Sequence, residues 1–304
     1  MLDPEELYEI ADGVEVPPDT VMIEALDGFI DIAGVTKAAR DHLLATMPNT
    51  VLATFDADQL IDYRARRPLL MFDRDHWMSY AEPLLAIHLV TDPTGKSFLL
   101  LAGPEPDVQW ERFIRAVRSV LQRFGVKLTI GLQAIPMAVP HTRPIGVTAH
   151  GTRTELTRGY EPWVDQVQVP GSAGHLLEYR LGQAGMDAMG FAVHVPQYLA
   201  QAEFPGAAAA LLSAVGASAE LDLPVAELVE AGDRVRDEID SQVAKSEEIS
   251  AVVEGLERQY DEIAAARARE NPLAPEGRSL PTGEELGAEL ERFLAEQTGH
   301  GDST

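Results

Sequence analysis

The residues best suited to chemistry in this chain lie in or directly after apolar runs that predict strands. Carboxylates, an imidazole and a guanidinium at the carboxyl ends of strands are groups that hold polar ligands in open α/β sheets. Glycines among them would let a ligand approach the backbone closely. The set predicts a ligand site at that edge of a sheet. The candidate ligand-binding residues are Asp27, Gly28, Phe29, Gly103, Glu105, Gly131, His141 and Arg143.

Several of these residues also have a purely structural interpretation. Glu105 and Asp107 precede a predicted helix, where free backbone amides and the helix dipole stabilise a carboxylate. His141 and Arg143 lie in a loop rich in proline, and they suit either an anion or an ordinary surface turn. The sequence alone leaves both interpretations open.

Known catalytic signatures are missing. The glycines at Gly28 and Gly34 are six residues apart, and Val35 stands where a phosphate-binding loop needs Lys. G-x-S-x-G and H-E-x-x-H do not occur, and no G-x-G-x-x-G follows a predicted strand. The eight His are scattered, and the absence of Cys excludes thiol chemistry and Cys-ligated metals. We therefore expect no metal and no cofactor, and enzymatic activity is not favoured.

The charge of the chain is strongly negative and unevenly placed. There are 24 Lys and Arg against 49 Asp and Glu, a net charge of −25. Such a balance argues against nucleic acid and anionic membranes as general partners. Residues 219–304 alone carry 22 acidic and 8 basic residues. The acidic N-terminus does not resemble a signal peptide, and the apolar runs are too short to span a membrane, so we expect a cytoplasmic protein.

The pattern of apolar residues predicts an α/β core with a mainly parallel sheet covered on both faces. The clearest helix begins at Trp110 and ends near Gly125, which stands where a C-cap is expected. The other predicted helices span residues 34–46, 173–184 and 205–215. The predicted strands span residues 21–26, 51–55, 67–73, 84–91, 97–102, 127–132, 145–150, 164–169 and 191–195.

One pair of these strands predicts a hairpin, because the turn Asp92-Pro93-Thr94-Gly95 joins residues 84–91 to 97–102. It would either project and pair with another subunit or form a covered sheet edge. A basic concentration lies nearby, suited to acidic helices, a neighbouring subunit or a ligand phosphate. Its members are Arg64, Arg66, Arg67 and Arg74.

The C-terminal part predicts helices of another kind. An imperfect heptad seam runs from Leu228 to Ile263, with polar breaks at Gln242 and Ser246. It predicts one long helix or two helices bent near residues 245–247, serving as a packed pair or as a lid or partner-binding arm. The predicted divisions are a core over residues 1–218, a helical lid or arm over 219–270, and a last part over 271–304. That part holds a linker, a short amphipathic helix with a capping box from Thr282, and a flexible tail.

The order of several short motifs resembles the proteasome assembly chaperone family, in particular its uncharacterised bacterial branch typical of actinobacteria. The motifs are Asp27-Gly28-Phe29 with Gly34, Leu101 to Pro106, Gly125-Val126 with Leu128 to Gly131, Pro140 to Pro144, and Val195 to Leu199. The resemblance covers about residues 18–265. It implies a three-layer α/β/α sandwich similar to the core of purine nucleoside phosphorylases and peptidyl-tRNA hydrolases. It also implies a C-terminal helical extension and homo-oligomers, with a trimer as the first expectation. The projecting β-hairpin expected beside this core rests on the turn at residues 92–95.

Two functions follow from these observations. The first is a non-catalytic binding or assembly protein, with proteasome subunits or another protein as partner. The second is a small-molecule-binding protein, or an enzyme similar to a hydrolase or phosphorylase. It would use a cleft at the carboxyl ends of the strands under a helical lid.

Overall fold

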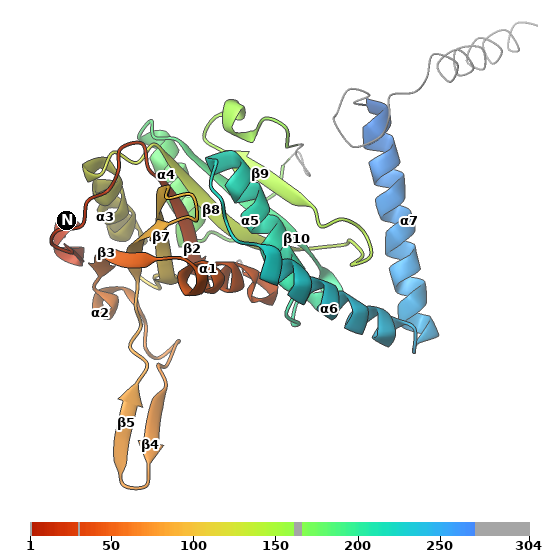
Figure 1. The fold of residues 1–304 in the computed structure, drawn as a ribbon, viewed down its shortest axis with the longest axis horizontal. Helices are drawn as coiled ribbons and strands as arrows, with labels where there is room; N and C mark the ends of the chain where they lie inside the picture. The colour runs from red at the N-terminus through yellow and green to blue at the C-terminus, as the bar shows by residue number, and fades with distance from the viewer. Residues whose placement is uncertain (1, 30, 161–165, 271–304) are drawn as a thin grey trace, which may run out of the picture. The chain divides into compact units, whose positions relative to one another are not determined.

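Successive side chains of the strand β2, Val21–Asp27, point to opposite faces of a sheet, and both faces are buried. The structure is a computed structural model that describes residues 2–29, 31–160 and 166–270 (Figure 1). The chain divides into two compact units, residues 1–257 and 258–304. The predicted boundary near residue 218 stays a prediction. The predicted linker, capping-box helix and tail of residues 271–304 lie outside the described residues.

Eight strands form the main sheet, in the order β1-β3-β6-β7-β2-β8-β10-β9. The bounds besides those of β2 are β1 Tyr8–Ile10, β3 Asn49–Phe55, β6 Ala86–Thr91, β7 Ser97–Pro104, β8 Leu128–Met137, β9 Val147–Gly151 and β10 Ala188–Pro196. The neighbours β7, β2, β8 and β10 are parallel, whereas β1, β3, β6 and β9 pair antiparallel. The prediction of a mainly parallel sheet was therefore right only for the centre, and the sheet is mixed.

Helices cover both faces of this sheet, which confirms the three-layer arrangement (Figure 1). The α-helices are α1 Val35–Thr46, α2 Ala57–Leu60, α3 Trp110–Arg123, α4 Ala173–Gln183, α5 Pro205–Ala219, α6 Ala226–Val243 and α7 Glu247–Glu270. The 3-10 turns are η1 Glu5–Leu7, η2 Ile32–Gly34, η3 Thr154–Thr157 and η4 Gln197–Leu199. Gly125 follows α3 with a φ of 64°, which confirms the predicted C-cap.

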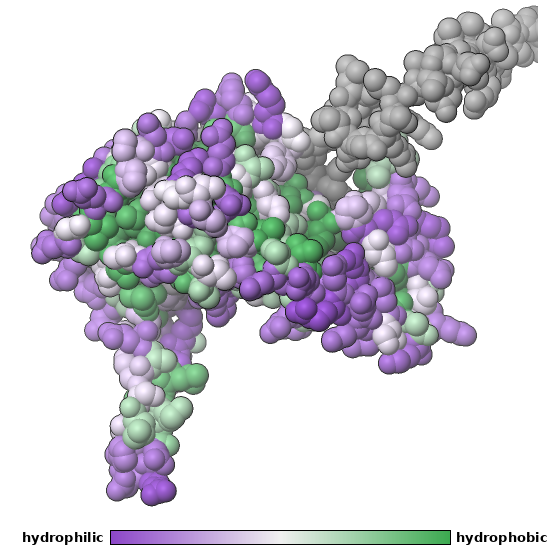
Figure 2. All heavy atoms as spheres, in the orientation of Figure 1, coloured by the Kyte–Doolittle hydropathy of each residue, from purple (hydrophilic) through white to green (hydrophobic). Residues whose placement is uncertain are grey.

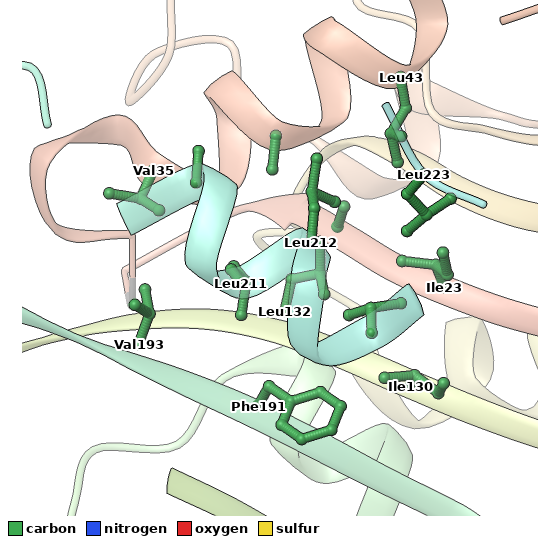
Figure 3. Close-up of a cluster of buried hydrophobic side chains, with 14 of the residues drawn as sticks. Ile23, Val35, Leu43, Ile130, Leu132, Phe191, Val193, Leu211, Leu212 and Leu223 are labelled. Atoms are coloured by element: carbon green, nitrogen blue, oxygen red, sulfur yellow. The ribbon is translucent and has the colours of Figure 1, made fainter. Parts of the chain in front are cut away.

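Two apolar cores lie between the three layers. On one face, Ile23, Ile130 and Phe191 from the strands pack with Leu43 of α1 and Leu211 of α5 (Figure 3). On the other face, side chains of β2 pack with α3 and α4. The buried members of that second core include Met22, Leu26, Phe113, Val117, Leu177 and Leu181. Alternate residues of β2 thus serve opposite cores, as its unbroken apolar sequence predicted.

The predicted hairpin is confirmed, but it neither projects nor forms an edge. β6 and β7 pair antiparallel across the turn at Asp92, whose carboxylate accepts hydrogen bonds from the amides of Thr94 and Lys96 at 2.9 Å. Both strands lie inside the sheet, between β3 and β2. A different hairpin projects from the core, namely β4 Leu70–Asp73 with β5 His76–Tyr80, which form a separate two-stranded sheet (Figure 1).

The strand predicted at residues 164–169 was wrong for its described part. Residues 166–169 form no strand and are exposed, because no sheet edge pairs with their alternating Val and Gln. Residues 164 and 165 lie outside the described ranges.

The heptad seam forms two helices, because α6 ends at Val243 and α7 begins at Glu247. α6 packs closely on α5 at a pair of glycines. A Cβ atom at Gly232 would lie 2.8 Å from the Cα atom of Gly206. Leu228 and Ile239 of the predicted seam are partly buried against the first core.

Candidate functional site

The carboxylate of Glu105 joins two of the predicted site segments. One of its oxygens accepts a hydrogen bond from the amide of Ala173 at 2.6 Å, and the other accepts one from the amide of Phe29 at 3.3 Å. A Cβ atom at Gly28 would lie 2.6 Å from Glu105 Oε2, so any residue other than glycine at this position would displace the carboxylate. Glu105 is buried, and together with Gly28 and Phe29 it forms one cluster.

Glu105 does not cap the helix that follows it in sequence. α3 begins at Trp110 after Gln109, which makes no side-chain capping bond, and Glu105 instead holds the start of α4. Asp107 accepts a hydrogen bond from the amide of Asp62 at 2.7 Å. The structural interpretation that placed Glu105 at its own helix N-terminus was wrong, because the side chain satisfies a helix 68 residues away.

Two arginines tie the same loops to their surroundings. The guanidinium of Arg40, nearly buried on α1, forms an ion pair with Asp27 at 2.6 Å. Arg66 donates hydrogen bonds to the backbone oxygen of Glu105 and to the carboxylate of Asp107. Arg66 lies on the segment that leads into the projecting hairpin, so the base of that hairpin is fixed to the loop of Glu105.

Gly103 has a structural role in this region. Its φ is 128°, and a Cβ atom there would lie 2.8 Å from the Cα atom of Leu85. A side chain at this position would therefore collide with the backbone that enters β6.

Gly131 lies beside an acidic residue that the sequence reasoning missed. Glu24, in the middle of β2, is 5% exposed, and its Oε1 accepts a hydrogen bond from the amide of Leu26 at 3.1 Å. A Cβ atom at Gly131 would lie 3.2 Å from Glu24 Oε2, and one at Gly174 of α4 would lie 2.6 Å from it. Burial raises the pKa of Glu24 to about 7, and the charges of Glu105 and Glu178 add to this effect.

A histidine pair continues this cluster across the sheet. His150 Nδ1 lies 3.0 Å from Glu178 of α4, and its Nε2 lies 3.3 Å from the side-chain oxygen of Gln133. The His175 ring lies 6.1 Å from the His150 ring, and burial, reinforced by His150, lowers the pKa of His175. A Cβ atom at Gly190 would lie 2.7 Å from His150 Nε2. Glycine here leaves room for the imidazole.

Register explains why these groups meet. Glu24 pairs with Gly131, Gly131 with Gly190, and Gly190 with His150, so the four residues form one row across β2, β8, β10 and β9. The two glycines in the middle leave space above the sheet, and the side chains at either end occupy it under α4. The signal in the sequence was a single acid inside an apolar strand.

His141 and Arg143 belong to a second cluster. His141 is buried, with Nδ1 2.6 Å from the hydroxyl of Tyr198 and Nε2 3.0 Å from Asp240 of α6. Arg143 Nη1 lies 3.2 Å from Glu257 of α7. Burial raises the pKa of the Tyr198 hydroxyl. These contacts join α6 and the first part of α7, up to Glu257, to loops at the carboxyl ends of β8 and β10.

Apart from Gly103, the predicted site residues are thus divided between two groups. The first holds Gly28, Phe29 and Glu105, with Asp27 next to it and Gly131 reached through Glu24. The second holds His141 and Arg143. No contact described above joins the two groups directly. A single ligand site that uses both stays a prediction.

Two shallow surface hollows lie away from both groups. One is lined by residues that include Lys127, Asp187 and Glu220, and the other by residues 154, 155 and 157–160 with Ala149. Within the described ranges, no cluster of three His, Asp or Glu side chains is arranged to hold a metal ion. None of the helices described is both long and apolar enough to cross a membrane.

Comparison with known proteins identifies the family. The model of the PAC2 family matches residues 25–243. A protein of unknown function from Mycobacterium tuberculosis is 45% identical, with a TM-score of 0.82, and the match covers 87% of this chain and 92% of that one. A protein of unknown function from Corynebacterium glutamicum is 37% identical, with a TM-score of 0.80 and coverages of 84% and 97%.

A third solved structure shares the fold at lower sequence identity. It is a proteasome-assembly chaperone homologue from Mycobacterium tuberculosis, 23% identical, with a TM-score of 0.71 and coverages of 77% of this chain and 100% of that one. No curated protein matches the chain. The resemblance first seen in the order of short motifs is thereby confirmed, and the chain belongs to the PAC2 family.

Proposed function

We propose that this chain is a non-catalytic, cytoplasmic protein-binding protein that assists the assembly of a larger complex, with proteasome subunits as its partners. Membership of the PAC2 family and the fold shared with a proteasome-assembly chaperone homologue support this function. The lack of known catalytic motifs agrees with it. Membership of the family is the observation that carries the escort function, and the exposed apolar hairpin β4–β5 would offer a surface to another protein chain.

The hairpin exposes large apolar side chains on both faces. Its polar tip is purple and its middle is largely green in Figure 2. The large apolar side chains of the hairpin and its base that are about half exposed or more are Leu69, Leu70, Met71, Phe72, Trp77, Met78, Tyr80 and Leu84. A contiguous apolar surface of this kind marks a site that another protein covers. An isolated two-stranded hairpin is at best marginally stable in water, which also favours a partner.

We assign self-association to this hairpin, with a trimer as the expected state. Sedimentation of the full chain tests it, with Trp77→Ser as the variant and Tyr179→Ser on α4 as the matched control. The two aromatic side chains are similarly exposed, at 64% and 60%. Trp77→Ser should weaken self-association at least about 5-fold, because a buried aromatic anchor contributes more than about 1 kcal/mol. Equal behaviour of the two variants would refute the assignment.

Capture of partners tests the escort function itself. The full chain is immobilised and offered purified 20S proteasome subunits. Retention of a subunit supports the function. Failure to retain any subunit at micromolar concentrations would overturn it, whatever the oligomeric state.

A small-molecule site is the second candidate, and one observation favours it. Asp240 of α6 and Glu257 of α7 contact the loop of His141 and Arg143, and such contacts would suit a lid at the carboxyl end of the sheet. Thermal shifts across a panel of nucleosides and peptides test this candidate. A ligand-dependent rise in Tm that Asp240→Ala removes would support it, and a flat panel would refute it.

A further inference from the structure

The face of α4 that packs on the sheet lies over ionisable side chains that the proposed function does not use. We propose that α4 is a pH-responsive element of the fold, whose first turn is held most firmly while Glu24 carries a proton and loosens when Glu24 loses it. The proposal is independent of any partner and goes beyond the assembly function.

The first support is the position of the Glu24 carboxylate. It lies between the backbone of β8 at Gly131 and the backbone of α4 at Gly174, where added Cβ atoms would stand 3.2 and 2.6 Å from Oε2. Among the described residues, no Lys or Arg forms an ion pair with Glu24. An ionised carboxylate in such a place is costly, because its only described hydrogen bond comes from the amide of Leu26.

The second support is the charge that faces Glu24 from the neighbouring elements. Glu105 after β7 and Glu178 of α4 are acidic, and both disfavour a charge on Glu24. His150 of β9 is paired with Glu178. His175 of α4 has a lowered pKa, so it adds no positive charge at neutral pH.

The remaining neighbours do not compensate for these acids. Gln133 of β8 is neutral and contacts His150. On α3, which packs against α4, Glu111 pairs with Arg180, and Arg112 binds Gln59. Arg115 of α3 has a buried Nε atom without a hydrogen-bond partner among the described residues, but Arg115 is not among the groups that shift the pKa of Glu24. No positive charge described here is therefore available to Glu24.

The first turn of α4 is the part of the structure that can yield. Gly174 is the residue nearest to the carboxylate oxygen, and the preceding amide, Ala173, is held by Glu105. Moving this turn outwards would let water reach Glu24. It would also separate α4 from Glu105 and so break the hydrogen bond to Ala173.

The sign of the effect follows from linkage. The pKa of Glu24 is about 7 with α4 docked, against a normal value of 4.5 once water reaches it. Through Glu24 alone, the docked turn is favoured most at low pH, loses stability as the pH rises from about 4.5 to about 7, and changes little above that. His175 of the same turn acts in the opposite direction, because its lowered pKa disfavours docking at low pH, so the net change is smaller than that of Glu24 alone. Between about pH 5.5 and about pH 8 the opening equilibrium should shift by up to about 30-fold.

Amide hydrogen exchange of the full chain tests the proposal, with rates corrected for the intrinsic effect of pH. Residues 173–177 should lose protection by up to about 30-fold from about pH 5.5 to about pH 8 in the wild type. At every pH they should remain less protected than α5. Glu24→Gln should reduce the change below about 3-fold. The matched control Glu111→Gln removes another acid that binds α4, through Arg180, and should behave as the wild type.

Several outcomes would overturn the proposal. One is a wild-type protection at residues 173–177 that is constant over this pH range. Another is equal exchange in α4 and α5 at every pH, which would mean global unfolding. A third is an unchanged pH response in Glu24→Gln. If that variant fails to fold, Glu178→Gln serves instead, and it must give a smaller change than the wild type.

Discussion

The contact between α5 and α6 depends on two glycines, and adding one methyl group there should be costly. A Cβ atom at Gly232 would lie 2.8 Å from both the Cα atom and the backbone nitrogen of Gly206. These are backbone atoms of a neighbouring helix, so no side chain can rotate away. In Gly232→Ala, α6 must therefore move outwards or the helices must bend.

The magnitude follows from two opposing effects. Replacing Gly by Ala inside a helix favours the helix by about 1 kcal/mol. Overpacking of a close contact costs about 1–3 kcal/mol. Gly255→Ala is the matched control, because Gly255 also lies inside a helix and a Cβ atom there has nothing within 4 Å. The helix preference is the same in both variants, so their difference isolates the packing cost.

Urea unfolding of both variants measures this difference. Gly232→Ala should unfold with a free energy about 1–3 kcal/mol below that of Gly255→Ala. Limited proteolysis with trypsin should also cleave faster after Arg234 and Arg236, because α6 is held less firmly in Gly232→Ala. Equal stability and equal cleavage of the two variants would refute close packing of α6 on α5.

Three further perturbations test the polar clusters. Glu24→Gln should raise the free energy of unfolding by about 3 kcal/mol at about pH 8 and by little near about pH 4, because the pKa of Glu24 is about 7 in the fold and 4.5 normally. A urea titration at both pH values checks this, and an equal effect at both would contradict it. Arg66→Gln should lower the free energy of unfolding by about 1 kcal/mol, because it loses the contacts with Glu105 and Asp107. The control Arg64→Gln, at an 89% exposed side chain, should lower it by less than about 0.5 kcal/mol, and similar values for the two variants would show that Arg66 does not anchor the hairpin base. Asp240→Ala should cost about 1 kcal/mol, because it removes a hydrogen-bond partner of the buried His141 while the 54% exposed Asp240 leaves room for water in its place. The control Asp237→Ala, at another exposed residue of the same helix, should cost little; thermal unfolding compares the two variants, and equal Tm values would argue against the contact.

The elements of the core could be predicted because their sequence patterns are local. The spacing of apolar residues in α3, the apolar run of β2 and the turn at Asp92 each carry their own signal, and all three were confirmed. The break between α6 and α7 was one of two predicted alternatives, and the polar breaks at Gln242 and Ser246 indicated its place.

The projecting hairpin could not be placed from the same patterns. β4 and β5 carry apolar residues that resemble those of buried strands, yet both faces are exposed. Whether a strand is buried depends on what packs against it. A strand that another protein covers carries the same apolar residues as a strand buried inside its own chain.

The site was harder to predict, because its contacts join distant residues. Glu105 lies before α3 in sequence but binds the start of α4. Glu24, the two glycines and His150 lie in one row only through the register of four strands, which a single sequence does not specify. His141 was recognised as a polar candidate, whereas its contact with Asp240 depends on how α6 returns to the core.

The central claim is that this PAC2 family member is a protein-binding assembly factor. Its most direct test is a calorimetric titration of the full chain into purified 20S proteasome subunits from the same organism. The account predicts a saturable complex with a Kd in the micromolar range or tighter, about −8 kcal/mol or more favourable. Absence of any saturable binding to all of the subunits at about 100 μM would contradict it.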